Sequence, residues 1–438
     1  MQHTHTWRFH HIDTWFFRES RPHETVGGAE LTSLFPPPAR TILGALRTMW
    51  GEALNVNWHE FAKAKETYLL PKPAEFTPVS KLEPKLDSEP KPELPDIDLI
   101  AAMGRGTSLG TIKAQGPWVC WNEKRLYPVP TFMFKKTDGT SSELFRLQIG
   151  APVNCDLGSV CLPILDNNAI GAKPLENTWV TAEGFTAILQ GSLPDPDNLY
   201  AAAKLYTKES RLGIARNNQQ RTAIDGLLYQ TSHIRPKDEI AIDIDITNID
   251  TNFLNLVLDK NQDYVRLGAE GRMATVEKLN PQTATLPNAP NISTASQDIG
   301  IFLTLLTPAH CASWYPDEFT CTEIQYQANK DSPSKTITVW KGILYGIELI
   351  LISAVLGKVY REGGWDLAAG GAHTPGGPRS IESLIPAGST WYCQVANGNI
   401  QEAITALHGK QIGANTELGR GIIAVGLWPK TEAPPELL

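Results

Sequence analysis

The sequence predicts an α+β protein made of two ferredoxin-like (RRM-like) units, each with the element order βαββαβ and with long loop and hairpin insertions. The length of 438 residues exceeds one usual domain. The 35 glycines and 32 prolines indicate many turns and long loops, as in β-rich proteins. Strand-like and helix-like segments also follow one another twice in the same order. We therefore expect an N-terminal unit over residues 1–285, with insertions at about 70–136 and 205–280, and a C-terminal unit over residues 295–438.

The N-terminal unit is expected to open with a buried strand and a helix. Residues 7–17 (WRFHHIDTWFF) are rich in aromatic and β-forming side chains. Pro36 to Pro38 precede apolar residues at helical spacing, and proline is favoured in the first turn of a helix because its missing N–H needs no partner there. A strand followed by such a helix is how a βαββαβ unit begins.

The middle of the chain predicts a long loop followed by further elements. Residues 72–98 alternate Pro, Lys and Glu and predict no packed structure. The glycine-rich residues 103–116 lack the spacing of a Walker A phosphate loop. Residues 177–190 predict a strand, a turn and a helix, and residues 265–277 predict a hairpin.

Residues 239–247 predict a half-buried strand, because four isoleucines alternate with other residues there. Asp243 and Asp245 fall on the face away from the isoleucines. Two such carboxylates can form a catalytic pair, but their place on a strand favours side chains that face solvent or a partner protein.

The C-terminal unit shows the same succession of elements. We expect strands at residues 299–307, 351–365 and 389–395, a short helix or irregular crossover at 336–348, a helix at 401–408, and a closing strand at 421–428.

Composition and charge limit the classes of function. A formal net charge of −8 and a pI near 5.7 count against a free nucleic-acid binder. The six cysteines form no C-x-x-C pair, which argues against a zinc site and, in the cytosol, against disulfides. The longest apolar run, at 347–356, is too short to span a bilayer. We expect a cytoplasmic protein with no membrane contact and no cofactor.

One basic stretch stands out from this acidic background. Residues 204–237 contain seven Lys and Arg residues against two acidic ones, a local charge of +5. Guanidinium groups suit phosphates, and the asparagines, glutamines and threonine between them can bond to sugars and base edges. A solvated hairpin without a ligand is the alternative. The Asn217-Asn218 pair is suited to the turn of such a hairpin.

Four sequence motifs resemble one known family. They are D-x-x-x-F-R-x-x-R-P from Asp13, F-P-P-P-x-x-T-I-x-G-A-L-R from Phe35, E-S-R-L-G-I followed by R-T-A-x-x-G-x-L-Y in the basic stretch, and G-x-N-T-E-L-G-R-G-I-I-A-V-G-L-W near the C-terminus. Together they resemble the third subunit of type III-B (Cmr) CRISPR effector complexes, which belongs to the RAMP superfamily.

The resemblance implies a non-catalytic RNA-binding subunit of an antiviral ribonucleoprotein. Such a subunit holds the 5′ tag of the guide crRNA and bridges the large cyclase/polymerase-like subunit and the backbone subunit, near target RNA. By analogy, the insertion at 70–136 would be a thumb that wedges into the guide–target duplex. The alternative is a metal-independent RAMP endoribonuclease that processes guide RNA, with an N-terminal histidine as acid or base.

The candidate RNA-binding residues are arginines of the basic stretch and of the opening motif, together with glycines whose backbone N–H groups can approach phosphate. They are Arg18, Arg21, Arg40, Thr41, Arg47, Arg211, Gly213, Arg216, Arg221, Arg235, Arg266, Arg272, Gly419, Arg420 and Gly421. Arg40 and Thr41 are expected in the first turn of a helix, where N–H groups attract an anion. Tyr229 is a candidate for base stacking. No catalytic or metal-binding residue is assigned, although the sequence crowds His3, His5, His10, His11 and His23 at the N-terminus.

Overall fold

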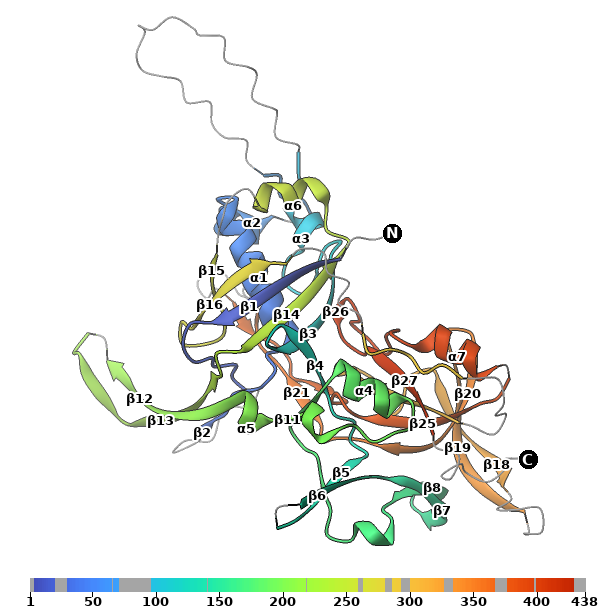
Figure 1. Cartoon of the computed structure of the whole chain (residues 1–438). Helices are drawn as coiled ribbons and strands as arrows, with labels where there is room; N and C mark the ends of the chain where they lie inside the picture. Colours follow the sequence, from blue (N-terminus) through green and yellow to red (C-terminus); the bar gives the residue numbers. More distant parts are fainter. Residues whose placement is uncertain are drawn as a thin grey trace, which may run out of the picture.

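The computed structural model contains both helices and strands, and its sheets are mainly antiparallel, in agreement with an α+β protein (Figure 1). The residues described are 4–19, 30–64, 66–70, 96–139, 141–217, 219–258, 263–279, 286–292, 300–326, 334–366, 376–397 and 399–428. The loop expected at 72–98 lies almost entirely outside them. No helix within these ranges is long and apolar enough to cross a membrane.

The larger sheet occupies the N-terminal part of the molecule. Its strands are, in spatial order, β11 (Leu199–Ala201), β10 (Thr178–Thr181), β4 (Lys124–Pro128), β3 (Lys113–Trp121), β14 (Ile240–Thr247), β1 (His5–His11), β16 (Met273–Lys278) and β15 (Tyr264–Arg266), with β26 (Leu418–Gly419) paired to β3. The helices α1 (Ala39–Ala53) and α6 (Thr251–Leu258) follow β1 and β14 in the chain. Strands β3, β14 and β16 of this sheet fall within the residue ranges 70–136 and 205–280 that were predicted as insertions.

The smaller sheet has the spatial order β18 (Phe319–Tyr326), β19 (Lys335–Leu344), β20 (Ile347–Val355), β25 (Thr390–Val395), β17 (Ile301–Leu305) and β27 (Ile423–Leu427). Helix α7 (Ile400–Leu407) joins β25 to β27. The helix or crossover predicted at 336–348 is wrong. Tyr345 and Gly346 both have positive φ, 51° and 82°, and this two-residue turn makes β19 and β20 a hairpin.

The remaining elements are short helices and peripheral strands. The helices are α2 (Trp58–Lys63), α3 (Leu99–Met103), α4 (Ala182–Leu189) and α5 (Ala202–Leu205). The strands are β2 (Glu30–Leu31), β5 (Met133–Asp138), β6 (Ser141–Arg146), β7 (Gln148–Cys155), β8 (Gly158–Ile164), β9 (Lys173–Pro174), β12 (Tyr206–Asn217), β13 (Thr222–Pro236), β21 (Tyr360–Glu362), β22 (Trp365–Asp366), β23 (Gly377–Pro378) and β24 (Glu382–Leu384).

The hydrophobic core does not divide at the boundary expected near 285–295. Helix α1 buries Ile42, Leu46 and Trp50 against the larger sheet, as the spacing of its apolar residues predicts. A second cluster combines side chains from both halves of the chain. Within it the rings of Phe132 and Phe302 meet edge to face, with centroids 5.2 Å apart.

The carboxylates of Asp243 and Asp245 lie inside the larger sheet, so the prediction that they face solvent is wrong. Strand β14 has paired strands on both sides and is buried on both faces. Arg8 Nε lies 2.8 Å from Asp243 Oδ1, and Arg125 Nη2 lies 2.6 Å from Asp245 Oδ1. Trp118 Nε1 also donates to Asp245, at 3.2 Å. The two aspartates neutralise two arginines that the same sheet buries.

Candidate nucleic-acid interface

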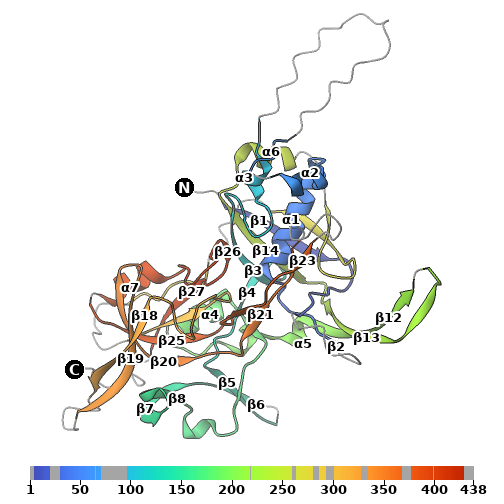
Figure 2. The ribbon, with the colours of Figure 1, turned by 180° about the vertical axis from the view of Figure 1, so that it is seen from behind.

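Strands β12 and β13 form a long hairpin that extends away from the rest of the molecule (Figures 1 and 2). Its base is attached to the body, because Trp15 and Ile234 exchange backbone hydrogen bonds of 2.8 and 2.9 Å. At the far end, Asn217 Oδ1 accepts from the N–H groups of Gln219 and Gln220, and Arg221 has a φ of 55°. The turn predicted at Asn217 therefore forms, and it places Arg221 at the exposed end of the hairpin.

A pocket of about 360 Å³ lies near the base of the hairpin. It is lined by Arg211, Leu212, Gly213, Tyr229, Thr231, Glu270 and Arg272. Gly213 is paired with Tyr229 across the two strands. A Cβ at position 213 would overlap the ring of Tyr229, so glycine is required there to let the ring lie across the strand. The ring remains 40% exposed.

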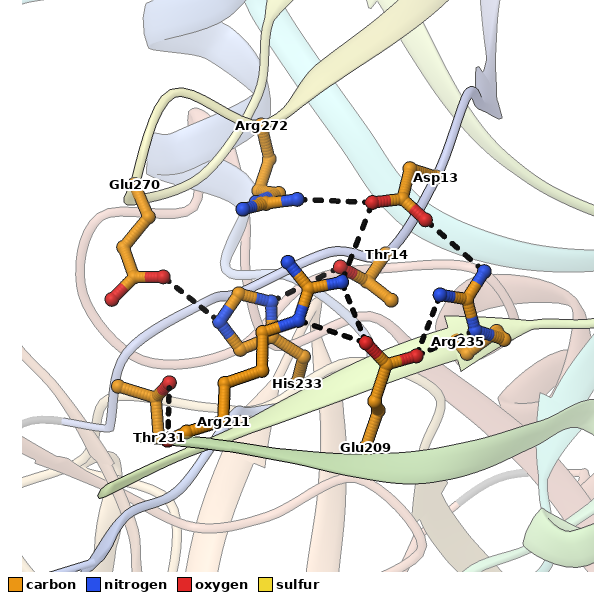
Figure 3. Close-up of polar contacts among 9 residues, drawn as sticks. All are labelled: Asp13, Thr14, Glu209, Arg211, Thr231, His233, Arg235, Glu270 and Arg272. Atoms are coloured by element: carbon orange, nitrogen blue, oxygen red, sulfur yellow. Dashed lines mark hydrogen bonds and ion pairs between the residues drawn. The ribbon is translucent and has the colours of Figure 1, made fainter. Parts of the chain in front are cut away.

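Three arginines from separate segments converge on Asp13 beside this pocket (Figure 3). The distances to its carboxylate are 3.4 Å from Arg211, 3.1 Å from Arg235 and 3.0 Å from Arg272. Glu209 completes the cluster, at 2.6 Å from both Arg211 and Arg235. We call these five residues the arginine cluster. The partners on Asp13 were not predicted from the sequence.

The carboxylates of the arginine cluster are held in their ionised form. Partial burial of Asp13 acts to raise its pKa, but the hydrogen bonds and charges of Arg211 and Arg235 outweigh this, and the pKa lies below its ordinary value. The pKa of Glu209 is lowered mainly by its hydrogen bonds from Arg211 and Arg235. Their side chains are 47% and 31% exposed, so these ion pairs are in contact with water.

His233 lies fully buried beneath the same surface. Its ring stacks on Phe16, with centroids 4.8 Å apart and planes 8° from parallel. Nε2 is 3.0 Å from Glu270 Oε2 and Nδ1 is 3.1 Å from the hydroxyl of Thr14. Because a carboxylate only accepts, Nε2 carries the proton and Nδ1 accepts from Thr14. Burial, followed by the charge of Arg211, lowers the pKa of His233, so the ring is neutral.

Arg420, Gly419 and Gly421 are buried, which contradicts their assignment as RNA contacts. Arg420 Nη2 lies 3.0 Å from Glu362 and 2.6 Å from Glu382. The two glycines have φ of 80° and 72°, and a Cβ on either would meet the backbone of a neighbouring strand or loop. They are therefore glycines because of packing within the chain.

The first turn of α1 does not offer the anion site that was predicted at Arg40 and Thr41. The N–H of Thr41 already donates to the carbonyl of Pro38, at 2.9 Å. The guanidinium of Arg40 pairs with Glu362 and Glu382, at 3.3 and 3.2 Å. Arg40 and Arg420 thus share the same two carboxylates and tie α1 to the C-terminal half.

Arg47 is also turned inward, against the prediction. Its guanidinium donates to the backbone carbonyls of Gly106 and Ser108. Burial, together with the charges of Arg379 and Arg40, lowers its pKa to about 10. Of the remaining candidates, Arg18 and Arg266 are exposed. Arg21 and the side chain of Arg216 lie outside the described residues.

Two of the N-terminal histidines have hydrogen-bond partners within the described part of the chain. His10 pairs with Glu277 at 3.0 Å, and His11 Nε2 contacts the carbonyl of Lys237 at 3.1 Å. His3 and His23 lie outside the described residues. Among the residues that the structure describes, no group of three or more His, Cys, Asp or Glu could hold a metal ion.

The sequence contained a partial signal for the residues that were missed. Glu209 stands two positions before Arg211, which places both on one face of a strand. Asp13 begins the opening motif, but nothing local links it to arginines about two hundred residues away. Glu270 sits among the glycines of a hairpin turn, where the sequence indicates only a charged turn residue.

One comparison with known proteins identifies the family of this chain. The family model described as CRISPR-associated protein (Cas_Cmr3) matches residues 7–428. No curated protein matches the chain. A chain of Type III-B Cmr-beta bound to cognate target RNA and AMPPnP is 13% identical, with a TM-score of 0.39, covering 88% of this chain and 86% of that one. A chain of Type III-B Cmr-beta bound to cognate target RNA is 12% identical, with a TM-score of 0.37 and the same coverage. On the family model, which spans nearly the whole sequence, the chain belongs to the Cmr3 family and is a subunit of a type III-B CRISPR effector.

Proposed function

We propose that this subunit binds the 5′ tag of the guide crRNA at the base of the β12–β13 hairpin. The three arginines of the arginine cluster would contact the phosphates, and the ring of Tyr229 would stack on a base. The observation that carries this proposal is the convergence of Arg211, Arg235 and Arg272 beside a pocket that contains an exposed aromatic ring. Guanidinium groups bind successive phosphates, and an aromatic face stacks on an unpaired base.

The carboxylates of the arginine cluster do not prevent this role. Ion pairs between water-exposed side chains contribute only about 0–1 kcal/mol each. A phosphate can therefore replace Asp13 or Glu209 as the partner of an arginine at small cost. In the absence of RNA the two carboxylates keep the three arginines apart and oriented, so that less side-chain entropy is lost on binding.

The fold supports a scaffold role in the complex. Along the chain, the central elements of the larger sheet follow one another as β1, α1, β3, β14, α6 and β16, which is a βαββαβ succession. In the sheet, the four strands lie side by side in the order β16, β1, β14, β3, so the fourth strand of the succession is next to the first, and the third lies between the first and the second. In the smaller sheet β27, β17, β25 and β20 lie in the same order, with the β18–β19 hairpin in place of a first helix. We infer two ferredoxin-like units, which together bridge the large cyclase/polymerase-like subunit and the backbone subunit next to target RNA.

We further propose that the subunit is non-catalytic. Two of the N-terminal histidines have partners within the chain, His10 with Glu277 and His11 with a backbone carbonyl. The paired aspartates of β14 are buried against arginines. The alternative, a guide-processing endoribonuclease, requires that the purified chain cut repeat RNA. Intact RNA after incubation with and without divalent metal supports the scaffold role. Cleavage that is lost in His11→Ala or His23→Ala would establish the alternative.

The binding site is tested with fluorescently labelled tag RNA and the full-length chain. Replacing Arg211 and Arg272 together by alanine is expected to weaken binding at moderate salt by at least about tenfold, roughly 1.4 kcal/mol, and to reduce the slope of log Kd against log salt. Lys358→Ala removes an exposed cation of the C-terminal half and serves as the control. Thermal melting checks that the double variant is folded. Unchanged affinity in a folded double variant would rule out this site.

A further inference from the structure

We propose that the pocket at the base of the hairpin selects a guanine base, and that Glu270 is the residue that reads it. This inference rests on the proposed function, because it names the base that the RNA site accepts. Three observations carry it: the position of the Glu270 carboxylate in the pocket, the strained backbone that puts it there, and the buried histidine that orients it.

The Glu270 carboxylate has one oxygen occupied and one open. Oε2 accepts from His233 Nε2 at 3.0 Å, as drawn in Figure 3. Within the described part of the chain, Oε1 has no hydrogen-bond partner. The side chain is 31% exposed and lines the pocket together with Tyr229 and Arg272. A carboxylate oxygen that faces a pocket with an aromatic wall is an acceptor for polar hydrogens on a flat ligand.

The backbone at Glu270 is in a conformation that favours glycine. Its φ is 57°, in the left-handed region, and the next residue, Gly271, has a φ of 65°. A residue with a Cβ is energetically disfavoured in this region. Glycine at position 270 would form the β15–β16 turn without that cost. The glutamate at this position supplies a carboxylate that pairs with His233 and lines the pocket.

His233 fixes the carboxylate without neutralising it. The ring is fully buried, stacks on Phe16 and accepts from Thr14, so its Nε2–H points at Glu270 in one orientation. Because the ring is neutral, it adds no positive charge beside the Glu270 carboxylate. His233 is thus a positioning residue for Glu270.

An anionic acceptor in a pocket distinguishes the four bases by their hydrogen-bonding edges. Guanine presents two adjacent donors, N1–H and the 2-amino group. The carboxylate can accept both, one at Oε1 and the other at the second lone pair of Oε2, which His233 leaves unused. Adenine and cytosine present an amino group next to a bare ring nitrogen, whose lone pair a carboxylate repels. Uracil presents one N–H between two carbonyl oxygens, which are repelled as well. Specificity therefore comes from attraction to guanine and from repulsion of the others.

The rest of the pocket fits a nucleotide. Its volume of about 360 Å³ lies within the range of about 300–1,000 Å³ found for small-molecule sites. The ring of Tyr229 supplies the stacking face. Arg211 and Arg272 also line the pocket, where they can bind the phosphates on either side of the base.

The test uses the full-length chain and short single-stranded oligouridines of equal length. Each carries one central guanosine, inosine or adenosine, or only uridine. We expect the guanosine oligonucleotide to bind at least about tenfold more tightly than the adenosine one, with inosine, which lacks the 2-amino group, in between. In the variant E270Q this preference should fall to within about threefold, and the affinity for oligouridine should rise, because the carboxylate that repels the uracil oxygens is gone while the arginines remain.

A second pair of variants tests the role of His233. His233→Phe keeps a ring against Phe16 but removes the donor to Glu270, and it should reduce the guanosine preference. His233→Gln can still donate to Glu270 through its amide and should restore part of the preference. A merely structural role would change the affinity for every oligonucleotide alike and leave the ratio between guanosine and adenosine intact.

The outcomes separate this inference from the proposed function. Salt-dependent binding of all four oligonucleotides with equal affinity would overturn the guanine assignment and leave the RNA site standing. A guanosine preference that persists in a folded E270Q would assign the reading to another residue and also overturn the inference. If the wild-type chain binds no RNA at any salt concentration, both proposals fail together.

Discussion

Arg125 and Asp245 lie on either side of strand β3 and meet through two short hydrogen bonds, of 2.8 and 2.6 Å, inside the larger sheet. Their side chains are 8% and 5% exposed. Arg8 and Asp243 form a parallel pair on the same face. The four charges cancel, so each is stable only while its partner is present.

Arg125→Ala is expected to lower the free energy of unfolding by about 3–5 kcal/mol, because it leaves a buried carboxylate without its main partner. Urea denaturation of the two proteins measures the difference. The double variant Arg125→Met with Asp245→Leu should be more stable than Arg125→Ala, since neither charge is then buried alone. A loss below about 1 kcal/mol in Arg125→Ala would show that water reaches the site.

Asp13→Asn is expected to raise the affinity for tag RNA by up to about fivefold, the equivalent of about 1 kcal/mol. Arg272 then has no carboxylate in the cluster to exchange for a phosphate, and Arg211 and Arg235 have only Glu209. The slope of log Kd against log salt should become steeper. Asp138→Asn, on β5, is the matched control for loss of one negative charge. Weaker RNA binding in Asp13→Asn would mean that the carboxylate orients the arginines more than it competes for them.

Gly213→Ala is expected to weaken RNA binding, because the added methyl group occupies the space of the Tyr229 ring and forces it out of place. Gly44→Ala is the control. Its methyl group on helix α1 would meet nothing within 4 Å, and it should stabilise the protein by up to about 1 kcal/mol without affecting RNA binding. Titration with labelled tag RNA and thermal melting measure both effects. Normal RNA affinity in Gly213→Ala would exclude stacking on Tyr229.

Stability is expected to fall as the pH drops below 6.5, the ordinary pKa of histidine, because burial lowers the pKa of both His233 and His408 in the folded chain. The unfolded chain then binds protons that the folded chain does not, so the stability present at neutral pH is lost as the pH approaches the lowered pKa values. Asp13 and Glu209, whose pKa values are lowered from 3.8 and 4.5, lose their contribution only at more acidic pH.

His408→Gln should flatten part of this pH dependence in thermal melts between pH 7.5 and pH 5. In the wild type its Nε2 donates to the carbonyl of Pro287 at 2.9 Å and its Nδ1 accepts from the N–H of Val425 at 3.3 Å, so a protonated ring would lose the second bond. His59→Gln, on the exposed face of α2, is the control for removal of a histidine. An unchanged profile in His408→Gln would assign the pH dependence to other groups.

Local patterns in the sequence determined the elements whose signal is contained within a few residues. The helix from Ala39 follows from the three prolines before it and its apolar spacing. The hairpin turn at Asn217 follows from side chains that cap their own backbone. The family motifs likewise identified the Cmr3 family, because they are short and keep their order along the chain.

The tertiary structure decided which charged side chains are available. Arg420 and Arg211 are both arginines near glycines in family motifs. The side chain of Arg420 is only 4% exposed and lies between two glutamates, whereas that of Arg211 is 29% exposed and lies beside a pocket. Asp243 and Asp245 alternate with isoleucines as on a solvent-facing strand, but both faces of β14 are buried and the two aspartates pair with Arg8 and Arg125. Ion pairs depend on distance in space and not on separation in the sequence. Asp13 pairs with Arg235 and Arg272, which lie more than two hundred residues away in the chain. The sequence by itself therefore showed where the basic residues gather, while the packing of distant segments decided which of them can meet a ligand.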